Sequence, residues 1–160
     1  DISIMSELRT NRIVPRDGLP SGSSGAPIQI RYGSTSSIVD STSNSYIDSG
    51  ITATITPTRA DSKILVMTSI SGVQKNGSTY LKARLLRDST EIALLDDGAC
   101  YTNSGGYNIV GSVTTNILDS PSTTNAVTYK VQFMSAENVS RIRLQTNSSV
   151  SSIVLMEIAG

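Results

Sequence analysis

Carboxylates, amides and glycines gather in one polar stretch of the chain. Asp96-Asp97-Gly98 is followed by Asn103 and by Gly105-Gly106. Carboxylate, amide and carbonyl oxygens are the ligands that Ca²⁺ prefers in proteins. The spacing differs from that of an EF-hand loop, and Asp-Gly and Gly-Gly are also ordinary turn pairs. The stretch is therefore either a calcium-binding loop or a solvated turn.

Catalysis would have to come from carboxylates or from one thiol. The chain has no His, which excludes a Ser-His-Asp triad, a Cys-His dyad and a His-ligated zinc within one chain. Cys100 has no neighbouring base, so we expect a small, partly buried hydrophobic residue rather than a reactive thiolate. Pairs of carboxylates can hydrolyse sugars. The candidates for such a pair are Asp88, Glu91, Asp96, Asp97 and Asp119. Sugar-cleaving clefts also need stacking aromatics, and this chain has no Trp, so we expect no enzymatic activity. We also expect no metal and no cofactor.

Two other stretches have the composition of adaptable binding loops. Residues 75–80 and 101–107 combine Tyr with Asn, Ser and Gly, and variable polar loops on a rigid scaffold commonly carry recognition. Plain solvated turns are the alternative. The candidate receptor-binding residues are Asn76, Tyr80, Tyr101, Asn103 and Tyr107.

Two pairs of arginines are interpreted as structural. Arg84 and Arg87 form one pair, and Arg141 and Arg143 form another, which we place opposite Glu157. Opposite charges on neighbouring strands stabilise a sheet. We therefore expect cross-strand ion pairs or subunit contacts here rather than ligand sites.

The elements that hold these loops are predicted to be strands. The 160 residues include 27 Ser and 17 Thr but only nine Ala, and hydroxyl side chains compete with the helical backbone for its hydrogen bonds. Basic and acidic residues number 13 each, and zero net charge argues against broad binding to nucleic acids or anionic membranes. A single Cys cannot build an intrachain disulfide framework. The composition predicts an all-β protein.

Residues 28–160 are predicted to form a β-sandwich of the jelly-roll type, because short apolar runs alternate with clusters of turn residues. Alternation is clearest where Ile51, Ala53 and Ile55 are separated by threonines, which indicates one buried and one wet face. The predicted strands are residues 28–32, 36–40, 46–55, 63–73, 80–87, 91–95, 107–118, 128–134, 140–146 and 152–158.

Two of these strands are apolar on both faces. They contain residues 63–67 and 153–156, and a sandwich strand of this kind has to bury its second face. A covering loop within one subunit is one solution. A subunit interface is the one we favour, because a core with one Phe and no Trp is thin and oligomerisation buries more surface. The candidate interface residues of a homotrimer are Ile64, Val66, Met67, Val154 and Met156.

The first 27 residues are predicted to be an extended N-terminal arm, because prolines and glycines punctuate apolar residues of no regular spacing. A flexible terminus is one interpretation. Docking onto another protein is the other, because a solvated tail has little use for so many large aliphatic residues. The candidate docking residues are Ile4, Leu8, Arg9, Ile13, Val14 and Leu19.

Several segments share strings of residues with a known family. In the body they are Asp61-Ser-Lys-Ile-Leu-Val-Met67, Ala83-Arg-Leu-Leu-Arg-Asp-Ser-Thr90, Leu118-Asp-Ser-Pro-Ser-Thr-Thr124 with Thr128-Tyr-Lys-Val-Gln132, and Ser152-Ile-Val-Leu-Met-Glu-Ile-Ala159. They resemble the C-terminal β-domain of fibre-type virion proteins of bacteriophages, especially those infecting marine cyanobacteria. Residues 5–22 are similar to the segment that starts many of these proteins. Because residues 1–4 precede Met5, an upstream start or a processed precursor would each account for the beginning.

The resemblance implies a jelly roll like that of the complement and tumour-necrosis-factor superfamily, assembled as a homotrimer and displayed on a virion that assembles in the host cytoplasm. The leading hypothesis is a short fibre or knob that attaches the phage to its host. Its expected partners are tail or major capsid proteins, through the arm, and host surface polysaccharide. A capsid decoration protein that stabilises the head is the second hypothesis, and a sugar-cleaving fibre is the third. No nucleic acid partner is expected. No membrane insertion is expected either, since the longest apolar runs, residues 64–67 and 153–156, are too short to span a bilayer.

Overall fold

Buried and exposed side chains alternate along most strands of this protein, as the sequence pattern predicted. The computed structural model describes residues 27–160, which form ten β-strands and one short 3-10 helix, η1 (Thr146–Ser148). All ten predicted strands are confirmed, with their ends shifted by a few residues. They are β1 (Pro27–Thr35), β2 (Val39–Ser41), β3 (Ile47–Ile55), β4 (Lys63–Asn76), β5 (Leu81–Arg87), β6 (Thr90–Ala99), β7 (Tyr107–Asp119), β8 (Val127–Ser135), β9 (Arg141–Leu144) and β10 (Ser151–Ile158).

The predicted arm falls almost wholly outside the described residues. This holds for all of its candidate docking residues, Ile4, Leu8, Arg9, Ile13, Val14 and Leu19. Of the predicted arm, residues 1–27, the structure describes Pro27, which begins β1 and pairs with Ile158 of β10. Pro27 therefore belongs to the sandwich and not to the predicted arm.

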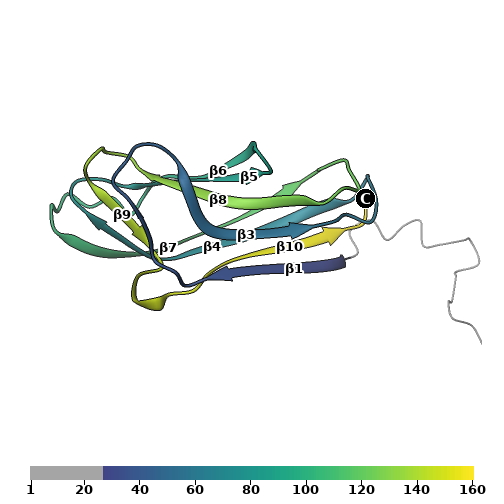
Figure 1. Cartoon of the computed structure of the whole chain (residues 1–160), viewed down its shortest axis with the longest axis horizontal. Coiled ribbons are helices and arrows are strands. Elements are labelled where there is room, and N and C mark those ends of the chain that lie inside the picture. Colours follow the sequence, from purple (N-terminus) through teal and green to yellow (C-terminus); the bar gives the residue numbers. More distant parts are fainter. Residues whose placement is uncertain (1–26) are drawn as a thin grey trace, which may run out of the picture.

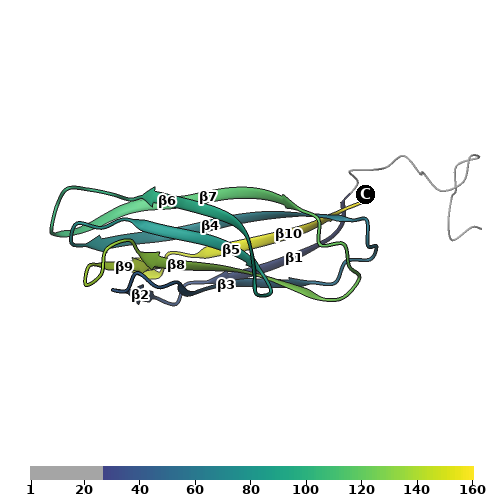
Figure 2. The same cartoon turned by 90° about the horizontal axis from the view of Figure 1, so that it is seen from above.

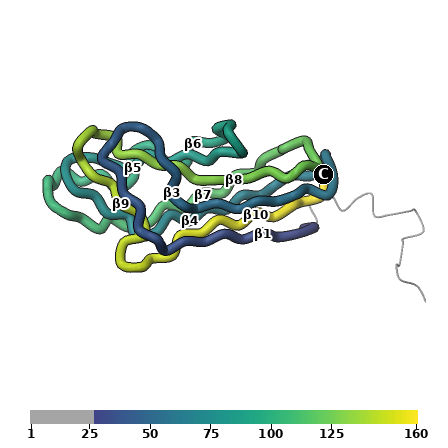
Figure 3. Tube along the Cα trace, viewed as in Figure 1, coloured from purple at the N-terminus to yellow at the C-terminus, as the bar shows by residue number. Residues whose placement is uncertain are grey.

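The strands form two antiparallel sheets that pack face to face as a β-sandwich (Figures 1 and 2). Sheet A has the order β1-β10-β4-β9-β2, and β7 pairs with β4 along its other edge. Sheet B has the order β3-β8-β5-β6. The start of β1 and the C-terminus lie at one end of the sandwich (Figure 3). The β4–β5 and β6–β7 connections lie at the opposite end, which we call the loop end. Helical structure in residues 27–160 amounts to η1, and no helix there is suited to cross a membrane.

The core is built from the inward-facing residues of both sheets. Tyr129 and Phe133 of β8 are its largest members, and aliphatic residues of β3, β4, β5 and β10 fill the space around them. Gly33 lets the edge strand β1 lie directly against β3, because a Cβ at this position would meet the carbonyl oxygen of Thr52. This contact closes the sandwich along one side.

Glu157 is a buried carboxylate at the end of the sandwich where β1 begins. It accepts hydrogen bonds from Gln29 Nε2 at 2.6 Å and from the backbone nitrogen and Oγ1 of Thr58, each at 2.8 Å. These bonds tie β1 and the β3–β4 connection to β10. Charge-assisted hydrogen bonds of this kind are among the stronger ones in proteins.

The expected pairing of Glu157 with Arg141 and Arg143 is wrong. Glu157 lies beside Ile64, at the start of β4, whereas β9 pairs with the end of β4. Both arginines contact Asp40 of β2 instead, at 3.6 and 2.9 Å. The error arose because strand order, which decides which charges meet, is not visible in the local pattern.

Replacing Glu157 with Gln should make the free energy of unfolding less dependent on pH in the acid range. Burial raises the pKa of Glu157, but hydrogen bonds, including those from Gln29 and Thr58, outweigh it, so the pKa lies below its ordinary value. A lowered carboxyl pKa stabilises the fold above the unfolded pKa, and this contribution is lost as the pH falls through the folded pKa. We expect Glu157→Gln to lower the free energy of unfolding in urea by about 1–3 kcal/mol at pH 7. The difference from the wild type should shrink below about pH 4.3, the ordinary Glu pKa.

Glu137→Gln is the matched control, because Glu137 is exposed in the turn before β9. It should change the free energy of unfolding by no more than about 0.5 kcal/mol. If the free energies of unfolding of Glu157→Gln and the wild type differed by the same amount from pH 7 to pH 3, the lowered pKa of Glu157 would be contradicted.

Candidate functional site

The outer surface of sheet A carries an apolar patch that crosses four neighbouring strands. Strand pairing aligns its members in rows. One row is Ile30, Met156, Leu65 and Leu118, and the next is Tyr32, Val154 and Met67. Together with Ile28, these residues are called the apolar face.

No part of residues 27–160 covers the apolar face. The exposed fractions of Ile30, Tyr32 and Leu118 are 54%, 63% and 58%. A covering loop, the alternative weighed from the sequence, is therefore absent from the described part of the chain. A row of hydroxyl side chains borders the patch, formed by Ser34, Ser152, Ser69 and Thr114. Contiguous apolar patches with a polar rim mark interaction surfaces.

The predicted interface residues divide between this surface and the core. Met67, Val154 and Met156 lie on the apolar face. Ile64 and Val66 do not, because their exposed fractions are 0% and they pack between the sheets. The prediction is wrong for these two residues, since successive strand residues point to opposite faces.

The outer surface of sheet B is polar, and its charges are paired. Lys130 contacts Asp48 at 3.1 Å, and Gln132 Nε2 donates to the same carboxylate at 2.7 Å. The Gln132 hydrogen bond is the largest cause of the lowered pKa of Asp48, and Lys130 adds to it. Arg84 donates two hydrogen bonds to Gln132 and pairs with Glu91 at 2.9 Å. The two outer surfaces of the sandwich therefore differ in chemistry: one is apolar, and the other carries paired charges.

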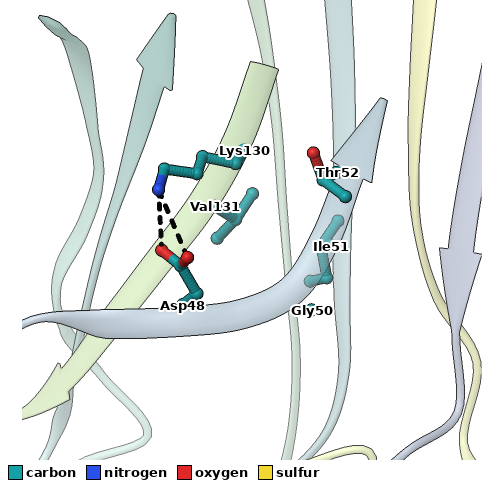
Figure 4. Close-up of a pocket in the computed structure, with 6 residues that line it drawn as sticks. All are labelled: Asp48, Gly50, Ile51, Thr52, Lys130 and Val131. Atoms are coloured by element: carbon teal, nitrogen blue, oxygen red, sulfur yellow. Dashed lines mark hydrogen bonds and ion pairs between the residues drawn. The ribbon is translucent and has the colours of Figure 1, made fainter. Parts of the chain in front are cut away.

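A shallow hollow lies beside Asp48, where β3 bulges away from β8 (Figure 4). Its volume is about 120 Å³, and its lining consists of Asp48, Gly50, Ile51, Thr52, Lys130 and Val131. The bulge appears as a register shift between Asp48 and Thr52, and Gly50 within it has a φ of 81°. Small-molecule sites usually enclose about 300–1,000 Å³. The hollow is a by-product of the bulge and too small for such a site.

The carboxylates considered for sugar cleavage each have a structural partner. The pairs are Asp88 with the Thr128 amide, Glu91 with Arg84, Asp96 with the Ala99 amide, Asp97 with Lys82, and Asp119 with Arg87 and Tyr129. The expected ion pairs of Arg84 and Arg87 are thus present. Burial raises the pKa of Cys100 to about 11, so its thiol is protonated at neutral pH. Within residues 27–160, no three His, Cys, Asp or Glu side chains form a group that could hold a metal.

The predicted calcium stretch is partly strand. Asp96-Asp97-Gly98 belongs to β6, which continues to Ala99, so the expectation of a loop is wrong at these positions. The loop itself begins at Cys100, and two of its backbone carbonyls, those of Thr102 and Ser104, already bind a cation of the protein itself.

That cation is the ammonium group of Lys75, which has an exposed fraction of 0%. Its Nζ donates to the carbonyl oxygens of Gly77, Thr102 and Ser104 at 2.7, 2.8 and 2.7 Å. Lys75 points inward because β4 shifts register between Ile70 and Val73, around Gly72, which reverses the alternation of its faces. The ammonium therefore joins the turn after β4 to the loop between β6 and β7.

Aromatic contacts reinforce this junction at the loop end. The rings of Tyr80 and Tyr101 meet edge to face with centroids 6.4 Å apart. Arg141 Nη2 donates to the hydroxyl of Tyr107 at 3.0 Å, and its guanidinium lies 5.8 Å from the ring centroid. The exposed fractions of Tyr101 and Tyr107 are 55% and 62%, so both rings are held by partners and still face solvent.

The structure brings the candidate receptor residues to one end of the sandwich. Tyr80, Tyr101, Asn103 and Tyr107 lie in or beside the two loops, and Asn76 ends β4 opposite Tyr107. We call Tyr80, Tyr101, Asn103 and Tyr107 the loop surface. Sequence reasoning missed Lys75 and the contact of Arg141 with Tyr107. The available signal was Gly72 inside a long strand pattern, which is typical of a bulge.

The described residues thus offer two candidate surfaces, the apolar face and the loop surface. Neither a protein-family model nor a curated protein matches this chain. Function is inferred from the chemistry of the two surfaces and from the sequence resemblance.

Proposed function

We propose that this chain is a non-enzymatic structural protein of a bacteriophage virion, a short trimeric fibre or knob that presents a binding surface to the host. The contrast between the two outer surfaces of the sandwich carries the proposal. The apolar face fits burial against other copies, whereas the paired charges of sheet B fit solvent. The resemblance to fibre-type virion proteins supports the setting.

In this proposal the sandwich is a jelly roll. Four strands in the order β1-β10-β4-β7 face four in the order β3-β8-β5-β6. The chain changes sheet at six connections, which are β2–β3, β3–β4, β4–β5, β6–β7, β7–β8 and β8–β9. Eight main strands divided between two sheets, with repeated crossings, support the jelly-roll arrangement.

The ends of the body support a display role. β1, which follows the arm, starts at one end, and the loop surface lies at the other (Figure 1). A body anchored through residues 1–26 would therefore hold its loop surface away from the particle. The trimer would place the apolar face towards its axis and sheet B outward.

The oligomeric state of the full chain tests the assembly step. Native mass spectrometry and light scattering should give three times 16.9 kDa. The trimer should persist at high salt, because an apolar interface is not screened by ions. A stable monomer of 16.9 kDa would contradict the proposal.

The position of the protein on purified particles tests its role. Density for the trimers at the tail, together with competition between the purified chain and infecting phage, would support the fibre. Density on the shell, with capsids weakened when the protein is removed, would identify a decoration protein instead. Absence of the chain from purified particles would contradict both.

A further inference from the structure

We propose that residues 2–8 of one copy add a strand to the free edge of β7 in the next copy of the trimer; this rests on the proposed trimer and names a partner for the arm. Among the described residues, β7 pairs with β4 alone, so the backbone groups along its second edge have no strand partner. The strand is 13 residues long. An exposed edge of this length is a template for pairing with another chain.

β7 also lacks the features that usually protect an edge strand. Such features are charged side chains, prolines and bulges. β6, the neighbouring edge of sheet B, has three acidic residues and three register shifts in its pairing. β7 has no Lys, Arg or Pro, and its one charged residue, Asp119 at its end, pairs with Arg87. From residue 113 to residue 119 its pairing with β4 is regular. This part of the edge is therefore open to a further strand.

The core is incompletely covered on the side of the sandwich where β6 and β7 lie (Figure 2). The opposite side is closed by the contact of β1 with β3 at Gly33. A strand added beside β7 would place every second side chain over the opening. Its occupant should therefore have large apolar residues at alternate positions. The apolar residues that are only partly buried against the core on this side are Ile92, Ala93, Ala99, Val110 and Ile117.

The start of the arm has this pattern. Although apolar residues have no regular spacing over the whole arm, Ile2, Ile4 and Leu8 stand at even positions, and Ser3 and Glu7 stand at odd ones. Alternation of this kind is typical of a strand with one apolar face. The segment has the same length as the regular part of the β7 edge. It can therefore pair along that edge with its large aliphatic side chains over the opening.

Symmetry assigns the added strand to the next copy. In the proposed trimer, sheet A faces the axis, so one edge of this sheet in each copy meets the opposite edge in its neighbour. Those edges are β1 and β7, which hold Ile30 and Leu118 at the two ends of one row of the apolar face. The arm precedes Pro27 and so leaves the body at the β1 edge.

The length of the arm allows this exchange. Residues 9–26 would connect the added strand to Pro27, and these 18 residues can span about 60 Å. β7 itself is about 44 Å long at 3.4 Å per residue. The connector can therefore reach any part of the neighbouring edge. It also leaves Ile13, Val14 and Leu19 for contact with the particle.

Residue-resolved hydrogen exchange of the full chain tests the added strand. With β4 as its one partner, β7 would protect about half of its amides, because alternate residues of an antiparallel strand bond to each side. With the arm in place, the amides of residues 113–119 that point away from β4 should also be protected. Ile4→Asp should make these amides exchange at least about tenfold faster, since its charge cannot lie over the core. Thr10→Asp places the same charge outside the added strand and should leave their exchange unchanged.

A photoreactive side chain shows which copy receives the arm. Ser3→p-benzoylphenylalanine should cross-link to residues 113–119 on irradiation and give covalent dimers and trimers on denaturing gels. In trimers assembled from a mixture of ¹⁵N-labelled and unlabelled copies, mass spectrometry should find labelled peptides joined to unlabelled ones. The same probe at Glu137, which is exposed in the turn between β8 and β9, is the control and should not link to these residues.

The outcomes separate this inference from the proposed function. A trimer in which the β7 amides exchange at the same rate in the wild type and in Ile4→Asp overturns the added strand and leaves the assembly intact. Cross-links confined to one chain, or to segments other than β7, also overturn it. A stable monomer would overturn the trimer and this inference with it.

Discussion

Replacing Lys75 with Met should free the two loops that it joins and destabilise the protein by about 2–4 kcal/mol. Hydrogen bonds to a charged donor contribute about 1.5–3 kcal/mol, and the buried carbonyls left unpaired add a penalty. Met keeps most of the buried volume of Lys75 but cannot donate to Gly77, Thr102 or Ser104. Urea unfolding at a fixed protomer concentration measures the stability change. Hydrogen exchange of residues 100–106 should accelerate, since their anchor is gone.

Lys130→Met is the matched control for this change. Lys130 also forms hydrogen bonds, but its side chain has an exposed fraction of 31% and pairs with the more exposed Asp48. Exposed pairs of this kind contribute about 0–1 kcal/mol. If the two variants lost equal stability and exchange in residues 100–106 did not change, Lys75 would not be the anchor of these loops.

Placing a carboxylate at the centre of the apolar face should dissociate the trimer. Met156 lies between Ile30 and Leu65 in the strand register. Its side chain points out of the sandwich, so Met156→Asp should fold as a monomer. In the assembly, each copy would bury an unpaired charge at a cost of several kcal/mol. We expect light scattering to fall to 16.9 kDa at micromolar concentration, with an unchanged circular dichroism spectrum.

Thr54→Asp places the same charge on the opposite outer surface. Thr54 is exposed on β3, where its hydroxyl meets that of Thr128. This variant should remain a trimer. A trimer of Met156→Asp as stable as the wild type would show that copies meet through another surface.

The strands could be predicted because their evidence is local. Ile51, Ala53 and Ile55 alternate with threonines in the sequence, and the same residues alternate between core and solvent in the structure. A strand presents successive residues to opposite faces whatever it packs against. Turn residues between the runs separated one strand from the next for the same local reason.

Which face of a strand is buried was not predictable where both faces are apolar. Ile64 and Val66 on one side of β4 and Leu65 and Met67 on the other are similar in hydrophobicity, yet the first pair is in the core and the second faces outward. Only the packing of sheet B against one side of sheet A separates them. Of the candidate interface residues, Met67, Val154 and Met156 therefore face outward and Ile64 and Val66 lie in the core, while the interface itself stays a prediction.

The sequence by itself determined an all-β chain without histidine chemistry, with neutral charge and with tyrosine-rich loops. The tertiary structure decided how those loops are joined and which surfaces are free. Lys75 binds the carbonyls of Thr102 and Ser104, which lie 27 and 29 positions later in the sequence, and Glu157 binds Gln29 across 128 positions. Such contacts depend on strand order and on the bulge around Gly72, which turns Lys75 inward. Local patterns cannot encode them, because they arise only when distant segments are packed together.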